Sequence, residues 1–213
     1  MYQLFDKTKI TRYSDLKNND SLSAYSGMTA QQNHNTFELF HNLLYFEQVS
    51  TILEIGTSLG GFTEFLDYTS KLLELNCNIR SYDIAHKDWY ENMKRSGIDV
   101  RVENIFSEDY QQVDSEVIDF IKNDGITIVL CDGGCKISEF HLLSKYLKPN
   151  DIIMAHDYAP NITYFREYIF SNIWNWMEIS DADIEEACVV NNLIDFMKEE
   201  LLSVAWVGKR KAV

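Results

Sequence analysis

Short apolar and β-branched runs alternate with longer amphipathic segments along most of the chain. The runs have the length of strands and lie at residues 51–55, 79–84, about 98–105, 127–132 and 152–157. Between them, apolar residues recur at three- and four-residue spacing over 61–75 and 137–147, which is typical of amphipathic helices. Strands that alternate with helices predict βαβ units and a largely parallel sheet.

The two ends of the chain depart from this alternation. A helix is predicted over 29–48, before the first strand, because apolar residues recur there at helical spacing. Near the other end, helices are predicted over 161–173 and 183–200, and strand-like runs occur at 174–180 and 202–208. Two closing strands with an acidic helix between them predict an antiparallel edge on the sheet.

The chain of 213 residues, 46% of them hydrophobic, is long enough to build one domain with a substantial core. Residues 1–28 carry a polar loop signal and no regular pattern, so we expect a flexible, irregular arm there. Residues 29–213 are expected to form a single doubly wound α/β domain, Rossmann-like, with helices on both faces of the sheet.

Charge and composition narrow the function classes. The net charge of −14 disfavours a nucleic-acid binder, which normally presents a basic face, and favours a small molecule or sugar as partner. No apolar run approaches the roughly 18 residues of a membrane span. The four cysteines show no C-x-x-C spacing, so no zinc knuckle or disulfide framework is predicted. We expect a cytoplasmic protein, and the aromatic residues of the arm are a weak indication of a homo-oligomer.

A glycine turn follows the first predicted strand, in the sequence Ile-Leu-Glu-Ile-Gly-Thr-Ser-Leu-Gly-Gly at 52–61. Glycine lets the backbone approach a ligand closely, and a helix N-terminus offers unpaired N–H groups beside it. The dinucleotide fingerprint G-x-G-x-x-G needs a middle glycine for the pyrophosphate. Because Thr57 and Ser58 follow Gly56 here, the turn suits a ligand without a pyrophosphate, and an NAD-linked oxidoreductase is disfavoured.

Two polar residues end the next two predicted strands. Asp83 lies 27 residues beyond Gly56, where a carboxylate can accept hydrogen bonds from the hydroxyls of a ribose. The alternative for Asp83 is a helix cap or an exposed turn. Asn104 can accept from an adenine amine through its carbonyl oxygen and donate to a ring nitrogen, and an ordinary loop asparagine is the alternative.

Three residues at the ends of the fourth and fifth predicted strands carry the clearest candidate chemistry. Asp132 and Asp157 end neighbouring strands, so both can share a cation such as Mg²⁺, which prefers oxygen ligands. The unperturbed pKa of a histidine side chain lies near neutrality, so His156 is a candidate general base. The alternative is that Asp132 contacts substrate or cofactor without a metal, and that His156 is a packed turn residue.

Four motifs in this order resemble class I S-adenosylmethionine (SAM)-dependent methyltransferases, in particular the group around cephalosporin hydroxylase and macrolide or rhamnosyl O-methyltransferases. The motifs are LEIGTSLGGFT at 53–63, the strand-ending Asp83, CDGG at 131–134 and LKPNDIIMAHDY at 147–158. The resemblance covers residues 29–158 by motif and the remainder by architecture. It implies a seven-stranded sheet of order 3-2-1-4-5-7-6 whose last strand is antiparallel.

The resemblance also implies a cofactor site and a metal site. SAM would be held by Glu54, Gly56, Thr57, Ser58, Gly60, Asp83, Ile84, Asn104 and Asp132. In metal-dependent relatives, an acid after strand four and a pair after strand five hold Mg²⁺, and Asp132 with His156-Asp157 matches those places. The sequence departs from the pattern at His156 and at Asn104, where relatives more often have an acid.

These observations together predict a SAM-dependent methyltransferase that methylates an oxygen of a small molecule or sugar, with or without Mg²⁺. Asp132, His156 and Asp157 are the predicted catalytic residues. Two alternatives stay open. One is an enzyme of the same fold that uses SAM or another nucleotide for different chemistry. The other is a non-catalytic relative that acts as a partner protein.

Overall fold

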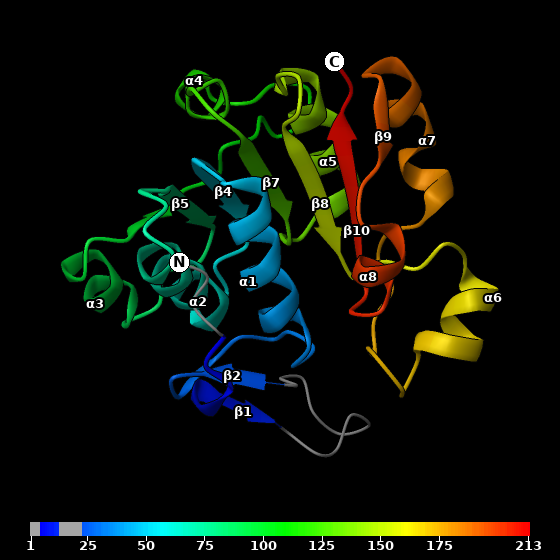
Figure 1. Ribbon diagram of the computed structural model, residues 1–213. Coiled ribbons are helices and arrows are strands. Elements are labelled where there is room, and N and C mark those ends of the chain that lie inside the picture. The colour runs from blue at the N-terminus through cyan, green and yellow to red at the C-terminus, as the bar shows by residue number, and fades with distance from the viewer. Residues whose placement is uncertain (1–4, 13–22) are drawn as a thin grey trace.

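A computed structural model describes residues 5–12 and 23–213, and its centre is a seven-stranded sheet (Figure 1). The strands are β4 (Thr51–Ile55), β5 (Asn78–Asp83), β6 (Asp99–Val102), β7 (Thr127–Cys131), β8 (Ile152–His156), β9 (Leu193–Asp195) and β10 (Trp206–Lys211). Their spatial order is β6-β5-β4-β7-β8-β10-β9. Counted along the chain from β4, this is 3-2-1-4-5-7-6, so the predicted order is confirmed. The first five strands pair in parallel, and β10 pairs antiparallel with β8 and β9.

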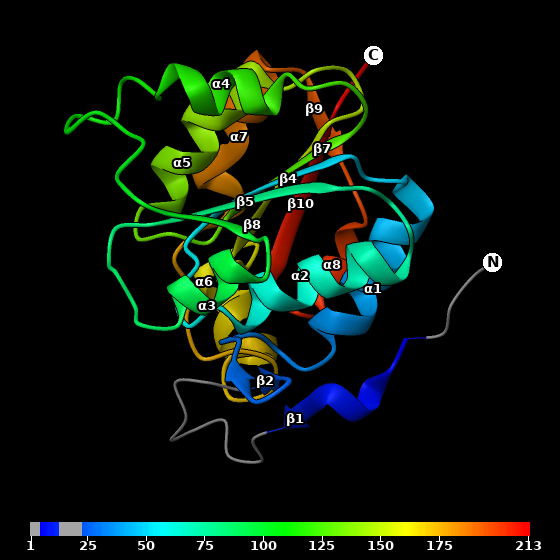
Figure 2. The same ribbon diagram turned by 90° about the vertical axis from the view of Figure 1, so that its left-hand side faces the viewer.

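Helices cover both faces of the sheet, as Figure 2 shows. One layer contains α4 (Ser115–Ile121), α5 (Lys136–Leu143) and α7 (Asp181–Val190), and the other contains α1 (Thr36–Glu47), α2 (Gly61–Leu72) and α8 (Lys198–Leu202). Short helices α3 (Tyr90–Arg95) and α6 (Ile162–Tyr164) lie at the periphery. All five residues of β4, β7 and β8 are buried, because helices cover both faces of the sheet and most of these side chains pack into one of two apolar cores.

The N-terminal segment differs from the prediction. Its described residues contain a 3₁₀ turn (Lys7–Lys9) and a three-stranded antiparallel sheet formed by β1 (Ile10–Arg12), β2 (Ser23–Tyr25) and β3 (Met28–Thr29). The expected irregular conformation is therefore wrong for these residues. Tyr25 anchors the small sheet against rings of α1 and α2, among them Phe37 and Phe65. The domain boundary at residue 29 stays a prediction, and part of the arm lies outside the described residues.

The helix predicted over 29–48 begins only at Thr36, because Thr29 belongs to β3 and Gln31 has a positive φ of 50°. Residues 30–35 thus form a connection that passes the carboxyl end of the main sheet instead of a helix start. This correction matters for the site, since Gln32 lies in that connection.

The C-terminal third contains further corrections. Residues 174–180 are not a strand: Trp174 and Ile179 make only isolated bridges, and both are buried. The helix predicted over 183–200 is divided into α7, β9 and α8, because Asn191 caps α7 and the next residues pair with β10. Of the helix predicted over 161–173, the structure contains only α6 and a π-helical turn that follows it, Phe165–Ile169. The predicted antiparallel edge is confirmed, but its strands lie elsewhere: β9 falls within the predicted helix 183–200, and β10 begins only at Trp206. In the described part of the chain, no helix has both the length and the apolar character needed to cross a membrane.

Candidate active site

Two cavities open where the parallel strands end. The first, which we call the β5-side cavity, has a volume of about 470 Å³ and is lined by Asp83, Asn104 and Tyr110 among others. The second, the β8-side cavity, has a volume of about 390 Å³ and is lined by His156 and Trp174 among others. Their linings share five residues, which form a common wall: Gly56, Ser58, Asp132, Lys136 and Glu178. Both volumes lie in the range of small-molecule sites.

The cavities divide the residues that the sequence singled out. The β5-side cavity is lined by Gly56, Ser58, Asp83, Ile84, Asn104 and Asp132. The β8-side cavity is lined by Glu54, Gly56, Thr57, Ser58, Asp132, His156 and Asp157. Gly60 instead faces the small N-terminal sheet and α3, since a Cβ at this position would lie 3.0 Å from side-chain atoms of Met28 and Met93.

Gly56 joins the two loops that carry the common wall. Its φ is +99°, and a Cβ there would lie 2.2 Å from the backbone oxygen of Asp132. A side chain is therefore excluded on two grounds, conformation and space. Besides lining both cavities, this glycine lets the loops after β4 and β7 touch, and the backbone N–H of Asp132 donates to Ile55 in the same place (2.9 Å).

Asp83 is fixed by the loop after β4 and by α3. Its Oδ2 accepts the backbone N–H of Ser58 (2.7 Å) and the hydroxyl of Tyr90 (3.2 Å), and its Oδ1 accepts the backbone N–H of Ala85 (2.8 Å). A carboxylate has about four acceptor positions, so roughly one remains for a ligand. The side chain is both held in place and still able to accept a hydroxyl.

Asn104 lies exposed at the rim of the β5-side cavity. Its Oδ1 accepts the backbone N–H of Phe106 (3.1 Å), so part of its acceptor capacity serves the loop. The ring of Phe106 stacks on that of Tyr110, with centroids 5.2 Å apart. The wall beyond Asn104 is therefore aromatic, which suits a flat heterocyclic ligand group.

Glu54, in β4 just before the glycine turn, is a buried carboxyl group that lines the β8-side cavity. Burial raises the pKa of Glu54 to about 7, although hydrogen bonds from Ser81 and Thr63 act in the opposite direction. Oε2 accepts from both hydroxyls, at 2.6 Å in the case of Thr63. Protonated Glu54 can keep both bonds. Because its pKa is raised to about 7, both protonation states are populated near neutral pH.

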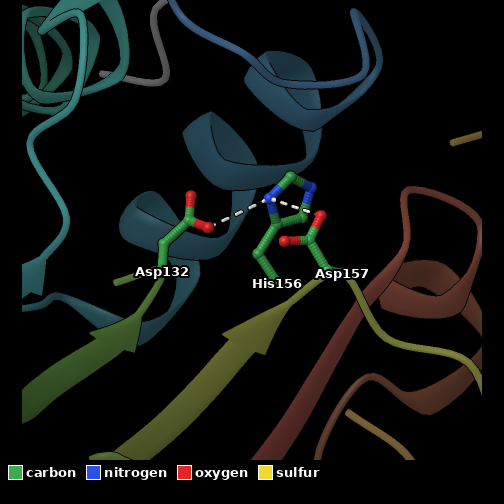
Figure 3. A group of neighbouring side chains, drawn as sticks. All are labelled: Asp132, His156 and Asp157. Atoms are coloured by element: carbon green, nitrogen blue, oxygen red, sulfur yellow. Dashed lines mark hydrogen bonds and ion pairs between the residues drawn. The ribbon is translucent and has the colours of Figure 1, made fainter. Parts of the chain in front are cut away.

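The three predicted catalytic residues are brought together at the ends of β7 and β8 (Figure 3). One potential ligand atom of each of Asp132, His156 and Asp157 lies within 4.8 Å of the other two. His156 Nδ1 is 3.2 Å from Asp132 Oδ1 and 3.7 Å from Asp157 Oδ1. Since a carboxylate can only accept, Nδ1 carries the proton toward Asp132.

His156 is also held by aromatic rings. It is 2% exposed, stacks on Trp206 with centroids 4.8 Å apart, and contacts Trp174 at 4.6 Å. Gln32 completes this packing: its Oε1 accepts from Trp206 Nε1 (2.9 Å), and its Nε2 donates to Asp132 Oδ2 (2.9 Å). Four segments far apart in the sequence thus fix one carboxylate and one imidazole.

Lys136 is a site residue that sequence reasoning missed. Its Nζ is 2.8 Å from Asp157 Oδ2, 2.8 Å from Glu178 Oε2 and 3.6 Å from Asp132 Oδ1, and it donates to the backbone oxygen of Gly133 (3.0 Å). Burial alone would lower the pKa of Lys136, but the charges of Asp132 and Asp157 raise it. The sequence did contain an indication of this role. A lysine in the first turn of a helix is disfavoured by the helix dipole, so its presence there predicts carboxylates nearby.

The surroundings of Asp157 also set its protonation state. Burial acts to raise the pKa of Asp157, but His156 and Lys136 outweigh it, and the pKa lies below its usual value. Trp174 Nε1 donates to Oδ1, and Lys136 contacts Oδ2. Because its pKa is lowered and Lys136 lies 2.8 Å from Oδ2, Asp157 is a fixed anion and a poor acceptor for a proton from a substrate.

The predicted magnesium site has its three residues in place, but their donor atoms do not fit Mg²⁺ in this arrangement. Mg²⁺ requires near-octahedral oxygen ligands at 2.0–2.1 Å. Here the third candidate ligand is an imidazole nitrogen, and the oxygens of Asp132 and Asp157 already face N–H donors. The metal stays a prediction that this geometry does not favour.

Comparisons with known proteins agree with the fold. The sequence model of the FtsJ-like methyltransferase family matches residues 31–167, well over half of the chain. No curated protein matches the sequence.

Solved structures give the same result at the level of the fold. A structure of CmcI with SAH has 14% identity and a TM-score of 0.60, over 94% of this chain and 88% of that chain. One of CmcI with Mg and SAM has 15% identity and a TM-score of 0.60, over 89% and 76%. An O-methyltransferase family protein from Burkholderia thailandensis has 8% identity and a TM-score of 0.51, over 84% and 55%. These identities show a shared architecture, and the family match shows the lineage: the chain belongs to the FtsJ-like methyltransferase family and has the Rossmann-like fold of class I SAM-dependent methyltransferases.

Proposed function

We propose that the protein transfers a methyl group from SAM to a hydroxyl oxygen of a small molecule or sugar. The observation that carries the proposal is that Asp132 stands in the wall shared by two cavities. One cavity suits a nucleoside and the other an acceptor, so a group between them can act on the acceptor atom next to the cofactor.

The β5-side cavity is the proposed cofactor site. Asp83 would accept a hydrogen bond from the ribose, and Asn104 with the aromatic wall of Phe106 and Tyr110 would contact the adenine. The turn at Gly56 to Ser58 closes the cavity toward the sheet. When bound, SAM supplies a methyl group on a sulfonium, whose electron-poor carbon is attacked in line by the acceptor oxygen.

The β8-side cavity is the proposed acceptor site. It combines the rings of Trp174 and Trp176 with the polar groups of Gln31 and Glu178. Aromatic faces with hydrogen-bonding groups between them suit a molecule that has both apolar and hydroxyl-bearing surfaces, such as a glycosylated compound or an aromatic alcohol. The acceptor hydroxyl would donate to the carboxylate of Asp132. Its proton would pass to that carboxylate as the new O–C bond forms and the methyl–sulfur bond breaks, which would release the demethylated cofactor as a neutral thioether.

His156 and Asp157 act through Asp132 in this proposal. His156 Nδ1 faces Asp132 Oδ1 and fixes the carboxylate, while Gln32 holds the other oxygen. Asp157 holds the ammonium group of Lys136 beside them. The finding that Asp157 is a fixed anion is the reason to assign the proton to Asp132 and not to Asp157.

Calorimetric titration with SAM, its demethylated product and NAD tests the cofactor, and a methylation screen read by mass spectrometry tests the reaction. We expect SAM and its product to bind, NAD not to bind, and one class of hydroxyl compound to gain 14 mass units, the difference of one CH₂ group. Binding of NAD without SAM would overturn the proposal. Binding of SAM with no transfer to any hydroxyl compound would favour the alternative of different chemistry on the same fold.

A further inference from the structure

The amino group of Lys136 lies in the space that a shared metal ion would need. Its Nζ is 2.8 Å from Asp157 Oδ2 and 3.6 Å from Asp132 Oδ1, the carboxylates that end β8 and β7. An ion bound by both would lie about 2 Å from an oxygen of each, and so next to the ammonium. Two cations at that separation repel strongly, so the ammonium and a divalent ion are mutually exclusive there.

Lys136 is built into this position. Its side chain is only 5% exposed, and its three N–H bonds are matched by three acceptors, on Asp157, Glu178 and Gly133. The lysine begins α5, where the helix dipole disfavours a cation, so the carboxylates around it must compensate. A lysine on the surface without a structural role would show neither this burial nor a complete set of hydrogen-bond acceptors.

Lys136 offsets part of the negative charge of the cluster. Three carboxylates, those of Asp132, Asp157 and Glu178, lie within 4.0 Å of Nζ. Lys136 also lines both cavities, so its charge faces the proposed cofactor site and the proposed acceptor site alike. It therefore provides at a fixed point the positive charge that a metal-dependent site obtains from a bound ion.

We propose that the Lys136 ammonium is the resident cation of this site: it fixes Asp157 and Glu178, neutralises part of the charge beside Asp132, and excludes a divalent ion. Lys136 is a positioning residue, because its N–H bonds are spent on the protein. The proposal rests on the proposed methyl transfer only for its activity readout, and the metal-binding readout is independent of it.

Binding of Mn²⁺, followed by electron paramagnetic resonance, tests the exclusion directly. The samples are the wild type, Lys136→Ala, Lys136→Met and the matched control Lys145→Ala, which removes an exposed lysine beyond α5. We expect the wild type and the control to bind equally weakly. Both Lys136 variants should bind at least about 100-fold more tightly, since a like charge has been removed from within roughly 4 Å of the ion. Lys136→Met keeps the bulk and gives the same test if Lys136→Ala does not fold.

Turnover supplies a second readout, with the acceptor found in the methylation screen. Wild-type turnover is expected to resist EDTA, whereas Lys136→Ala should lose about 100-fold and regain about tenfold with added Mn²⁺ or Mg²⁺. Tight Mn²⁺ binding by the wild type that disappears in Asp132→Asn would overturn the proposal. So would folded Lys136 variants without any gain in Mn²⁺ affinity. If no sample methylates any acceptor, the proposed function fails, and the Mn²⁺ comparison still decides the role of Lys136.

Discussion

The β5-side and β8-side cavities share a wall, yet they are built in different ways. The β5-side cavity is formed by residues that directly follow β4, β5, β6 and β7, and its polar groups are held by backbone N–H bonds, as at Asp83 and Asn104. The β8-side cavity is lined by side chains from distant segments, such as Gln31, His156 and Trp174. Contacts between distant segments also hold its residues, because Trp174 donates to Asp157. Gln32 likewise bonds to both Asp132 and Trp206. The first is a property of the fold and the second of this particular chain.

This difference supports the proposed division into a cofactor site and an acceptor site. Backbone-held strand ends recur wherever the fold recurs, so they suit a ligand common to many relatives. A cavity lined by Gln31, Trp174 and Glu178 can change its shape when any one of them changes, and so it suits a ligand that differs between relatives. Substitutions on the two sides should accordingly affect different quantities, cofactor affinity on one and turnover on the other.

The largest effect is expected at the shared wall. Asp132→Asn keeps the shape of the side chain but removes its charge and its capacity to take a proton, so turnover should fall about 1000-fold. SAM affinity should stay within about threefold, because the proposed cofactor contacts lie on Asp83 and Asn104. Steady-state kinetics and calorimetric titration measure the two quantities.

A matched control for this variant is Asp124→Asn, an exposed aspartate before the amino end of β7. It should leave both quantities unchanged. Near wild-type turnover in Asp132→Asn would remove Asp132 from the mechanism and, with it, the reason to place the acceptor in the β8-side cavity.

The buried Glu54 that lines the β8-side cavity gives the next largest effect, on stability. Its pKa is raised from 4.5 to about 7, so the folded state binds its proton more tightly than the unfolded state does. The free energy of unfolding should therefore fall as pH rises from about 4.5 to about 7, by about 3 kcal/mol in total. Glu54→Gln imitates the protonated form, keeps an acceptor for Thr63 and Ser81, and should abolish most of that fall.

Urea unfolding of the apo protein at pH 5 and pH 8 measures the effect. Glu139→Gln serves as a comparison, because burial also raises the pKa of Glu139 to about 7, but both its oxygens accept backbone N–H bonds, from Gly133 and Cys135. An amide there opposes one of those N–H groups, so this variant should be destabilised at both pH values. Equal pH slopes in wild type and Glu54→Gln would show that Glu54 is ionised throughout.

The cofactor side was predictable because its residues are local in the sequence. A strand, a glycine turn and a strand-ending acid have fixed spacing, and the parallel sheet brings such strand ends to one edge. For the same reason the meeting of Asp132 with His156 and Asp157 followed from strand ends. The sheet order followed instead from the resemblance to class I methyltransferases. What spacing could not show is that Gly56 is required by the backbone of Asp132, since this depends on the distance between two loops.

The acceptor side was not predictable in the same way. Gln32 reaches Asp132 across 100 residues of sequence and Trp206 across 174, and no periodicity encodes such contacts. The pattern at 174–180 suggested a strand because tryptophans suit strands, whereas Trp174 is buried there by His156 and Asp157. Tertiary contacts decided the structure of this segment, and those contacts are also what make the site.

On the cofactor side, Asp83→Asn tests the ribose contact. The substitution keeps the size of the side chain but loses the charge, and its NH₂ group opposes the backbone N–H of Ser58 or Ala85, so SAM should bind at least about tenfold more weakly. Turnover at saturating SAM should change less than about threefold, because the proposed contact of Asp83 is with the cofactor and the acceptor is contacted by Asp132. The exposed Asp88 provides the control, Asp88→Asn, with unchanged affinity. A loss of turnover without a loss of affinity would contradict the division between the two cavities.

The smallest effect is expected at the rim of the β5-side cavity, at Asn104. Asn104→Ala removes both a ligand contact and the bond to the Phe106 N–H, so SAM affinity should fall about threefold to tenfold. Asn104→Asp keeps the bond to Phe106 and offers the adenine amine a stronger acceptor, so affinity should rise a few-fold. The pair separates the two contributions: weaker binding in both variants would place the adenine away from Asn104, whereas opposite changes would locate it there. Asn104 lies at the outer rim of the β5-side cavity, so turnover at saturating SAM should stay constant in both variants. A change in SAM affinity without a change in turnover would separate the cavity that binds the cofactor from the cavity in which the acceptor reacts.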